Sequence, residues 1–230
     1  MRLYLLTASL SILLAASGRA QLTHDVEFAM FAGVTNYLGD LAEYNLEYNE
    51  TRPAYGLVFR YQVTPKFTVR AHYIHGTLGG NDRNSNTNRV RGYSFTAPLD
   101  EYAALLEYYP FGKHRYNNAG IFLPRLSPYI FVGGAFASAR STVVSPPDAP
   151  VSFPVAEDKS HFWVTPVGGG VRFDLVNHLN VSLEVGVRNA FSDYLDGVSA
   201  GSSANEDWYW FGGLTVGYYF LTPNPYRRRG

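Results

Sequence analysis

The chain of 230 residues carries 19 Lys and Arg against 19 Asp and Glu, so its formal net charge is zero and gives no electrostatic case for binding nucleic acid. It contains no cysteine, which excludes disulfides, thiolate metal sites and the modified N-terminal cysteine of a lipoprotein. Aromatic residues make up 16% of the chain, yet the mean hydropathy is only −0.13. This combination is typical of strands with one apolar and one polar face.

The first twenty residues have the pattern of an export signal. Arg2 is followed by an apolar core over 3–16 and by a small-x-small cleavage site at 18–20. The apolar core is shorter than the roughly 20 residues that a membrane-spanning helix needs. We therefore expect a cleaved signal peptide at 1–20 and an exported mature chain that begins at Gln21.

The rest of the chain shows a period of two and no comparable helical period. In the clearest segment, 179–191, one face is apolar (Leu179, Val181, Leu183, Val185, Val187) and the other is polar or small (Asn180, Ser182, Glu184, Gly186, Arg188). Eight segments alternate in this way, some less cleanly than others: 25–33, 54–62, 67–75, 100–109, 129–139, 162–174, 179–191 and 208–220. We predict eight strands.

The connections between these segments alternate in length. Short turns at 63–66 and 175–178 contrast with long polar loops at 34–51, 76–96, 140–160 and 190–206. An even number of strands with short turns on one side and long loops on the other is typical of a transmembrane β-barrel. We therefore predict an all-β protein: an eight-stranded antiparallel barrel over 21–220 in the outer membrane, with short periplasmic turns, long extracellular loops and a basic periplasmic tail at 221–230.

A soluble sandwich or lipocalin-like barrel is the alternative, and it would turn its apolar face inward. Aromatic residues near the ends of the apolar faces favour the membrane barrel, because such residues form the girdles at the two membrane interfaces. These residues are Tyr55, Tyr61, Tyr73, Tyr108, Trp208 and Tyr218.

The polar faces of the strands then line the interior of the barrel. An eight-stranded barrel is just wide enough inside for side chains to fill it, and charges enclosed there must pair. We expect an ion-pair network rather than a conducting pore, formed by Glu27, Arg60, Arg70, His72, Glu101, Glu107, Arg172, Asp174, Glu184 and Arg188.

Two similar sequences, NYLGD at 36–40 and DYLDG at 193–197, follow the first and seventh strands. Their carboxylates lack the spacing of a calcium loop, so we interpret them as turns rather than as cation sites. Tyr37, Asp40, Tyr194 and Asp196 are then anchors at the outer rim of the barrel.

The sequence also offers an enzymatic alternative. Some eight-stranded outer-membrane proteins modify lipid A with His and Ser or Asp at the outer rim, and His72, His75, Ser94 and Asp100 are near such a rim here. No Ser/His/Asp arrangement at motif spacing is present. We therefore predict no enzymatic activity, no catalytic residue, no cofactor and no metal site.

Several stretches together resemble the PorG family, small outer-membrane barrels of the type IX secretion system of Bacteroidetes. They are NYLGDL (36–41), TRPAYGLVFRYQVTPKFTVRA (51–71), SPYIFVGGAF (127–136) and FSDYLDGVS (191–199). The resemblance implies a non-enzymatic structural subunit of the secretion apparatus that associates in the periplasm with a ring of a lipoprotein and its partner, PorK and PorN. The alternative function is that of a stand-alone barrel of the OmpX or OmpW sort, in adhesion, envelope integrity or small-molecule passage.

A periplasmic ring can reach only the inner side of the barrel. There the segment 110–128 is far longer than a turn requires and combines basic with aromatic residues, and the tail is basic. The simpler explanations are that 110–128 is a flexible turn and that the basic tail binds anionic lipid headgroups. We expect partner contacts at Phe111, Lys113, Arg115, Tyr116, Phe122, Arg125, Arg227, Arg228 and Arg229.

Overall fold

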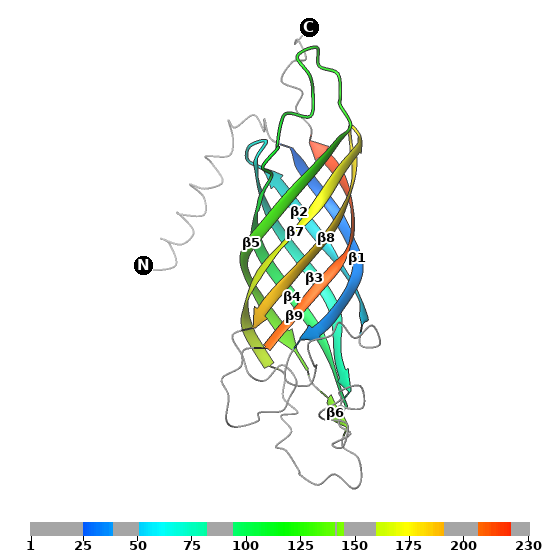
Figure 1. Ribbon diagram of the computed structural model, residues 1–230, viewed down its shortest axis with the longest axis vertical. Coiled ribbons are helices and arrows are strands. Elements are labelled where there is room, and N and C mark those ends of the chain that lie inside the picture. The colour runs from blue at the N-terminus through cyan, green and yellow to red at the C-terminus, as the bar shows by residue number, and fades with distance from the viewer. Residues whose placement is uncertain are drawn as a thin grey trace, which may run out of the picture.

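The computed structural model describes residues 25–38, 51–81, 94–140, 142–144, 160–190 and 207–221. These residues form a closed barrel of eight antiparallel strands, as Figure 1 shows, which confirms the predicted fold class. The predicted signal peptide at 1–20 and residues 222–230 of the tail lie outside the described residues. Within the described part of the chain, no helix is long and apolar enough to cross a membrane.

Eight strands build the wall, and a ninth short strand lies beyond the outer rim. The strands are β1 (Val26–Leu38), β2 (Arg52–Gln62), β3 (Phe67–Asn81), β4 (Ser94–Tyr108), β5 (Arg125–Ala139), β6 (Thr142–Val144), β7 (Ser160–Val176), β8 (Leu179–Ala190) and β9 (Asp207–Leu221). Each wall strand pairs with its neighbour in the chain, and β9 closes the barrel on β1. Sequence analysis missed β6, which continues the line of β5 along β4 from the pair Thr142 and Thr96.

The short turns lie together at one end of the barrel. Residues 63–66 join β2 to β3, where the Thr64 hydroxyl accepts hydrogen bonds from the backbone N–H groups of Lys66 and Phe67 at 3.2 and 3.0 Å. The β7–β8 turn contains only Asn177 and His178, two residues fewer than predicted, because β7 continues to Val176. The short-turn end is the periplasmic end by the usual organisation of such barrels.

The strands also reach further outward than the sequence pattern predicts. β3 continues to Asn81 and β4 begins at Ser94, so both enter the region predicted as the loop 76–96. On the periplasmic side β5 begins at Arg125 rather than at Tyr129, which shortens the predicted connection 110–128. In each case the backbone pairing with a neighbouring strand continues beyond the residues whose side chains alternate. That alternation is the only signal of a strand that the sequence offers here.

The two faces of the wall have opposite character. In β8, Leu183 and Val185 are 62% and 56% exposed, whereas Glu184 between them is 6% exposed. The same alternation places Leu57, Phe59, Val69, Leu106, Leu214 and Val216 on the outside. A continuous apolar outer belt around a charged interior is stable in lipid and not in water. The protein is therefore an outer-membrane barrel, and the soluble alternative is excluded.

Replacing Leu183 by Arg tests this assignment of the two faces. An arginine on the lipid-facing side near the middle of the bilayer costs about 2–4 kcal/mol of stability. Ile121→Arg is the matched control, since Ile121 is 60% exposed but lies in the periplasmic connection outside the wall. Urea unfolding in lipid vesicles should show the loss for Leu183→Arg and little change for Ile121→Arg. Equal stability of the two variants would contradict the assignment.

Candidate functional site

Three glutamates and three arginines meet in the periplasmic half of the barrel interior. Arg60 on β2 contacts Glu27 at 2.7 Å, Glu107 at 2.9 Å and Glu184 at 3.4 Å. Arg70 on β3 contacts Glu184 at 2.7 Å and Glu107 at 3.5 Å. Arg172 on β7 contacts Glu27 at 3.5 Å and Glu107 at 3.4 Å. Every charge in this cluster is thus shared between at least two partners.

Tyrosine hydroxyls add hydrogen bonds to two of these three carboxylates. Tyr109 donates a hydrogen bond to Glu107 and Tyr129 donates one to Glu184, both at 2.7 Å. The two tyrosine rings stack on one another with centroids 5.1 Å apart. Since hydrogen bonds reduce the cost of burying a charge, these hydroxyls are part of the ion-pair network.

A smaller cluster lies nearer the outer end of the barrel. Glu101 on β4 accepts a hydrogen bond from the Tyr209 hydroxyl at 2.7 Å and lies 2.9 Å from His72 Nε2. Arg188 contacts the same carboxylate at 3.4 Å, and its guanidinium lies over the ring of Phe211 at 4.6 Å. One acidic group is therefore shared by a histidine, an arginine and a tyrosine.

The periplasmic mouth of the barrel is closed by a residue from outside the wall. Arg115 lies in the connection between β4 and β5, yet only 7% of it is exposed. Its guanidinium lies 3.5 Å from Asp174 and 3.8 Å from Asp25, covers the ring of Tyr219 at 3.7 Å, and donates to the backbone carbonyl of Asn177 at 2.9 Å. Arg115 therefore joins the connection to the start of β1 and to the β7–β8 turn.

This mouth is tightly packed. Burial raises the pKa of Asp25 to about 6, and the positive charge of Arg115 opposes the increase. A cavity of about 20 Å³ remains beside Arg115, Tyr109 and Arg172, which is room for about one water molecule. Among the described residues, the packing around Arg115 thus leaves little open space at this end of the barrel.

The connection itself folds into a hairpin, which we call the periplasmic hairpin (residues 109–124). The backbone N–H groups of Asn117 and Leu123 donate to the carbonyls of Ile121 and Arg115, both at 3.0 Å. Gly120 closes the turn with a φ of 75°, a left-handed conformation that glycine adopts without strain. Figure 1 shows this segment in green, projecting beyond the end of the barrel opposite β6.

The base of the hairpin is fixed to the neighbouring β2–β3 turn. Tyr109 donates its backbone N–H to the carbonyl of Lys66 at 2.8 Å. A Cβ at Gly112 would lie 1.9 Å from the carbonyl oxygen of Pro65, so only glycine fits there. Together with Arg115, these contacts hold the hairpin against the barrel at two separate places.

The residues expected to bind a partner differ in how much of each side chain is exposed. Arg115 and Tyr116 are 7% and 9% exposed, so the barrel by itself presents little of either side chain to a partner. Arg115 is drawn inward by Asp25 and Asp174, whose carboxylates the barrel presents at its mouth. Sequence reasoning missed this role because it treated Asp174 as part of the wall network and Arg115 as part of a surface segment.

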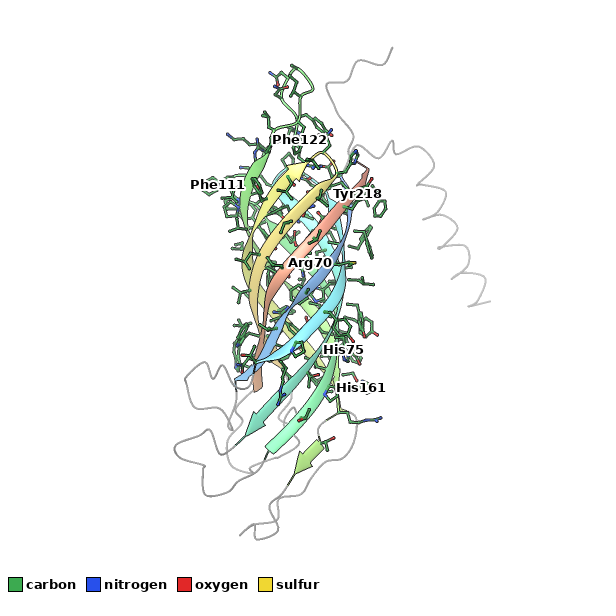
Figure 2. The ribbon with its side chains drawn as sticks, turned by 90° about the vertical axis from the view of Figure 1, so that its right-hand side faces the viewer. Arg70, His75, Phe111, Phe122, His161 and Tyr218 are labelled. Carbon is green, nitrogen blue, oxygen red and sulfur yellow. The ribbon has the colours of Figure 1, made fainter. Side chains whose placement is uncertain are left out.

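The other residues of that expectation are more accessible. Lys113 is exposed and Phe111 is 70% exposed, while Phe122 and Arg125 are half-buried. Figure 2 places Phe111 at the outer side of the barrel and Phe122 beside the mouth. Arg227, Arg228 and Arg229 lie outside the described residues.

All ten residues of the expected interior network point into the barrel, and their exposed fractions range from 0 to 6%. They separate into the two wall clusters and the mouth, where Asp174 pairs with Arg115. Of the expected rim anchors, Tyr37 lies in β1 one residue before the end of that strand at Leu38, and Asp40, Tyr194 and Asp196 lie outside the described residues.

The enzymatic alternative can be compared with this geometry. His72 contacts Glu101 inside the barrel, whereas His75 Nδ1 lies 2.8 Å from Asp100 Oδ1 on the outer face. The hydroxyl of Ser138, the residue paired with Asp100 on the next strand, makes no hydrogen bond to any described residue. Among the described residues, no serine or threonine hydroxyl donates to either histidine, so a serine–histidine pair is not formed in this part of the chain.

A polar, ion-paired interior within an apolar outer belt defines the class of this protein as an eight-stranded outer-membrane barrel. Within that class the chain belongs to the family described as "Domain of unknown function (DUF6089)", which matches residues 4–227. No curated protein matches the chain at a significant level.

Several solved outer-membrane barrels are similar in shape. The N-terminal β-barrel domain of Pseudomonas aeruginosa OprF is 14% identical, with 85% of this chain and 97% of that chain covered and a TM-score of 0.48. Ail, the attachment invasion locus protein of Yersinia pestis, is 11% identical over 85% and 98% of the two chains, with a TM-score of 0.47. The outer membrane enzyme PagL is 14% identical over 83% and 97%, with a TM-score of 0.37. No residue role is carried over from them.

A double-mutant cycle on Arg70 and Glu184 tests the wall network. Removing either partner leaves the buried cluster of three glutamates and three arginines with one unbalanced charge, so Arg70→Met and Glu184→Gln should each cost about 3–5 kcal/mol. The double variant should cost less than the sum of the single variants by about 1–3 kcal/mol.

Arg70→Met combined with Glu101→Gln is the control, because Glu101 belongs to the outer cluster, where its carboxylate contacts His72 and Arg188. Urea unfolding of the vesicle-inserted barrel should show near-additivity for the control pair. Near-additivity for Arg70 and Glu184 as well would show that their contact has no energetic coupling.

Proposed function

We propose that this protein is a non-enzymatic structural subunit of the type IX secretion apparatus, which fixes a periplasmic ring of the PorK and PorN kind to the outer membrane. The resemblance of residues 36–41, 51–71, 127–136 and 191–199 to the PorG family suggests this machinery. The observation that carries the proposal is the periplasmic hairpin, which is held firmly to the barrel and presents apolar side chains outside the membrane-spanning wall.

The hairpin has an inner and an outer face. Phe122 turns toward the mouth, where its ring lies 5.5 Å from the Arg115 guanidinium and 6.3 Å from the ring of Tyr116. Its sequence neighbours Ile121 and Leu123 turn away and are 60% and 41% exposed. Neither side chain is needed to build the hairpin core, so both are available to a partner.

The attachment of the hairpin makes these side chains suitable for docking. Apolar side chains exposed to water in a fixed geometry are characteristic of protein-binding surfaces, because little conformational entropy is lost when a partner covers them. Lys113 and His114 are exposed nearby and provide a basic border. We assign the main ring contact to Ile121 and Leu123, with Phe111 at the membrane boundary and the basic tail, including Arg227, as a weaker electrostatic contact.

Charged substitutions on the hairpin test this assignment. Ile121→Asp combined with Leu123→Asp should abolish co-purification of the ring after mild detergent extraction and should stop secretion, because the apolar contact surface is lost. Asn118→Asp combined with Ala119→Asp is the matched control: it adds the same two charges at exposed positions of the hairpin turn without removing a large apolar side chain. Heat-dependent mobility in gel electrophoresis checks that each barrel is folded.

Two outcomes would contradict the proposal. A wild-type barrel that is extracted without any ring favours the stand-alone OmpX-like or OmpW-like function. The second outcome is that the ring still co-purifies after 113–123 is shortened to a tight turn but is lost on deletion within 145–159. That result would place the docking surface on the opposite side of the membrane.

A further inference from the structure

We infer that the lipid-facing side of β3, β4, β5 and β7 carries a binding site for the headgroup of a phosphorylated glycolipid in the outer leaflet. Four polar residues lie side by side across these strands, and we call them the outer-rim row. Backbone pairing places His75 opposite Asp100, Asp100 opposite Ser138, and Ser138 opposite His161. Figure 2 shows His75 and His161 toward the end of the barrel opposite Phe122, far from the periplasmic hairpin.

The depth of this row in the membrane is set by an aromatic row beside it. Two residues closer to the middle of each strand, Tyr73, Tyr102, Phe136 and Trp163 lie in register on the same outer face. The rings of Tyr73 and Tyr102 are 4.9 Å apart, and those of Phe136 and Trp163 are 5.5 Å apart. Aromatic belts lie at the boundary between acyl chains and headgroups. The outer-rim row is therefore at the depth of the headgroups.

The polar groups are already oriented before any ligand binds. Asp100 Oδ1 accepts a hydrogen bond from the Tyr73 hydroxyl at 2.8 Å and lies 2.8 Å from His75 Nδ1. This contact leaves His75 Nε2 as the ring nitrogen available to a ligand. His161 stacks on Phe136 with ring centroids 5.7 Å apart and an interplanar angle of 10°. Fixed side chains lose little entropy on binding, which favours a specific site over a general interfacial surface.

A buried hydroxyl in the middle of the row independently indicates a ligand. Ser138 is only 7% exposed, and its Oγ makes no hydrogen bond to any described residue. Alternation along β5 directs it to the same outer face as Phe136, between Asp100 and His161. A buried hydroxyl without a hydrogen-bond partner is costly, and a sugar hydroxyl of a lipid headgroup would supply one.

Charge complementarity favours a phosphate on the same headgroup. Arg140 follows β5 and is exposed, and its backbone N–H donates to the carbonyl of Pro98 on β4 at 3.2 Å. Alternation places it two residues beyond Ser138 on the same face. A guanidinium and two imidazoles suit phosphate oxygens, while the carboxylate of Asp100 suits sugar hydroxyls. A phosphorylated sugar headgroup satisfies both sets, whereas a simple phosphodiester lipid satisfies one.

Native mass spectrometry of the full-length protein in nanodiscs containing bisphosphorylated lipid A tests this site. The triple variant His75→Ala, Arg140→Ala, His161→Ala should bind lipid A at least about tenfold more weakly than the wild type, because it loses three charge-assisted or polar contacts. Arg140→Lys in the wild-type background should retain part of the affinity. The control variant Lys66→Ala, His178→Ala removes exposed basic residues of the two periplasmic turns, at the opposite end of the barrel, and should bind as the wild type does.

The choice of lipid distinguishes the ligand. Wild-type protein should retain lipid A in preference to dephosphorylated lipid A and to phosphatidylglycerol, and millimolar inorganic phosphate should not displace it. Equal retention of all three lipids would reduce the row to an ordinary interfacial belt and overturn the proposal. Displacement by inorganic phosphate, or unchanged affinity in a folded triple variant, would overturn it as well.

Discussion

Glu107 lies where three arginines converge, with Arg60, Arg172 and Arg70 at 2.9, 3.4 and 3.5 Å from its carboxylate. Backbone hydrogen bonds of a barrel connect only adjacent strands, but these side chains reach across the interior. Arg70 and Glu184, for example, join β3 to β8, which are not neighbours in the wall. Because an interior this narrow cannot hydrate a charge fully, the pairing of these charges is required. The paired side chains also fill the interior of the barrel.

The periplasmic hairpin depends on the same constraint. Asp174 and Asp25 are acidic groups at the periplasmic mouth of the barrel, and Arg115 is the cation that contacts them. The hairpin is therefore held to the barrel by an extension of the interior ion pairing, and not only by its own backbone turn. A feature that resembles an overlong turn in the sequence becomes a rigidly held projection, and this rigidity is what gives Ile121 and Leu123 a defined position in the periplasm.

Alternation along the strands was enough to predict which side chains line the interior. Within each strand the alternation of polar and apolar side chains distinguishes the two faces. Arg60 and Glu184 could therefore be placed inside the barrel without knowing which residues they contact. The partners themselves could not be predicted, because they depend on strand register and tilt across the barrel. Arg115 shows the same limit, since it lies in an irregular segment with no period to indicate that it points inward.

The ends of the strands were harder to predict than their middle parts. β3 and β4 remain paired beyond the membrane, where one face no longer needs to be apolar and the alternation fades. β6 has only three residues, too few for a periodic signal. The outer-rim row has no signal in any single segment, because His75, Asp100, Ser138 and His161 belong to four strands and meet only through their register.

An interior filled by paired side chains implies that this barrel does not conduct ions. Single-channel recording of the purified full-length protein in planar lipid bilayers tests it most directly. A filled interior with a mouth cavity of about 20 Å³ predicts a flat baseline without discrete current steps at moderate voltage. Stable, large and reproducible single-channel steps would show a continuous water path through the interior and would contradict the account.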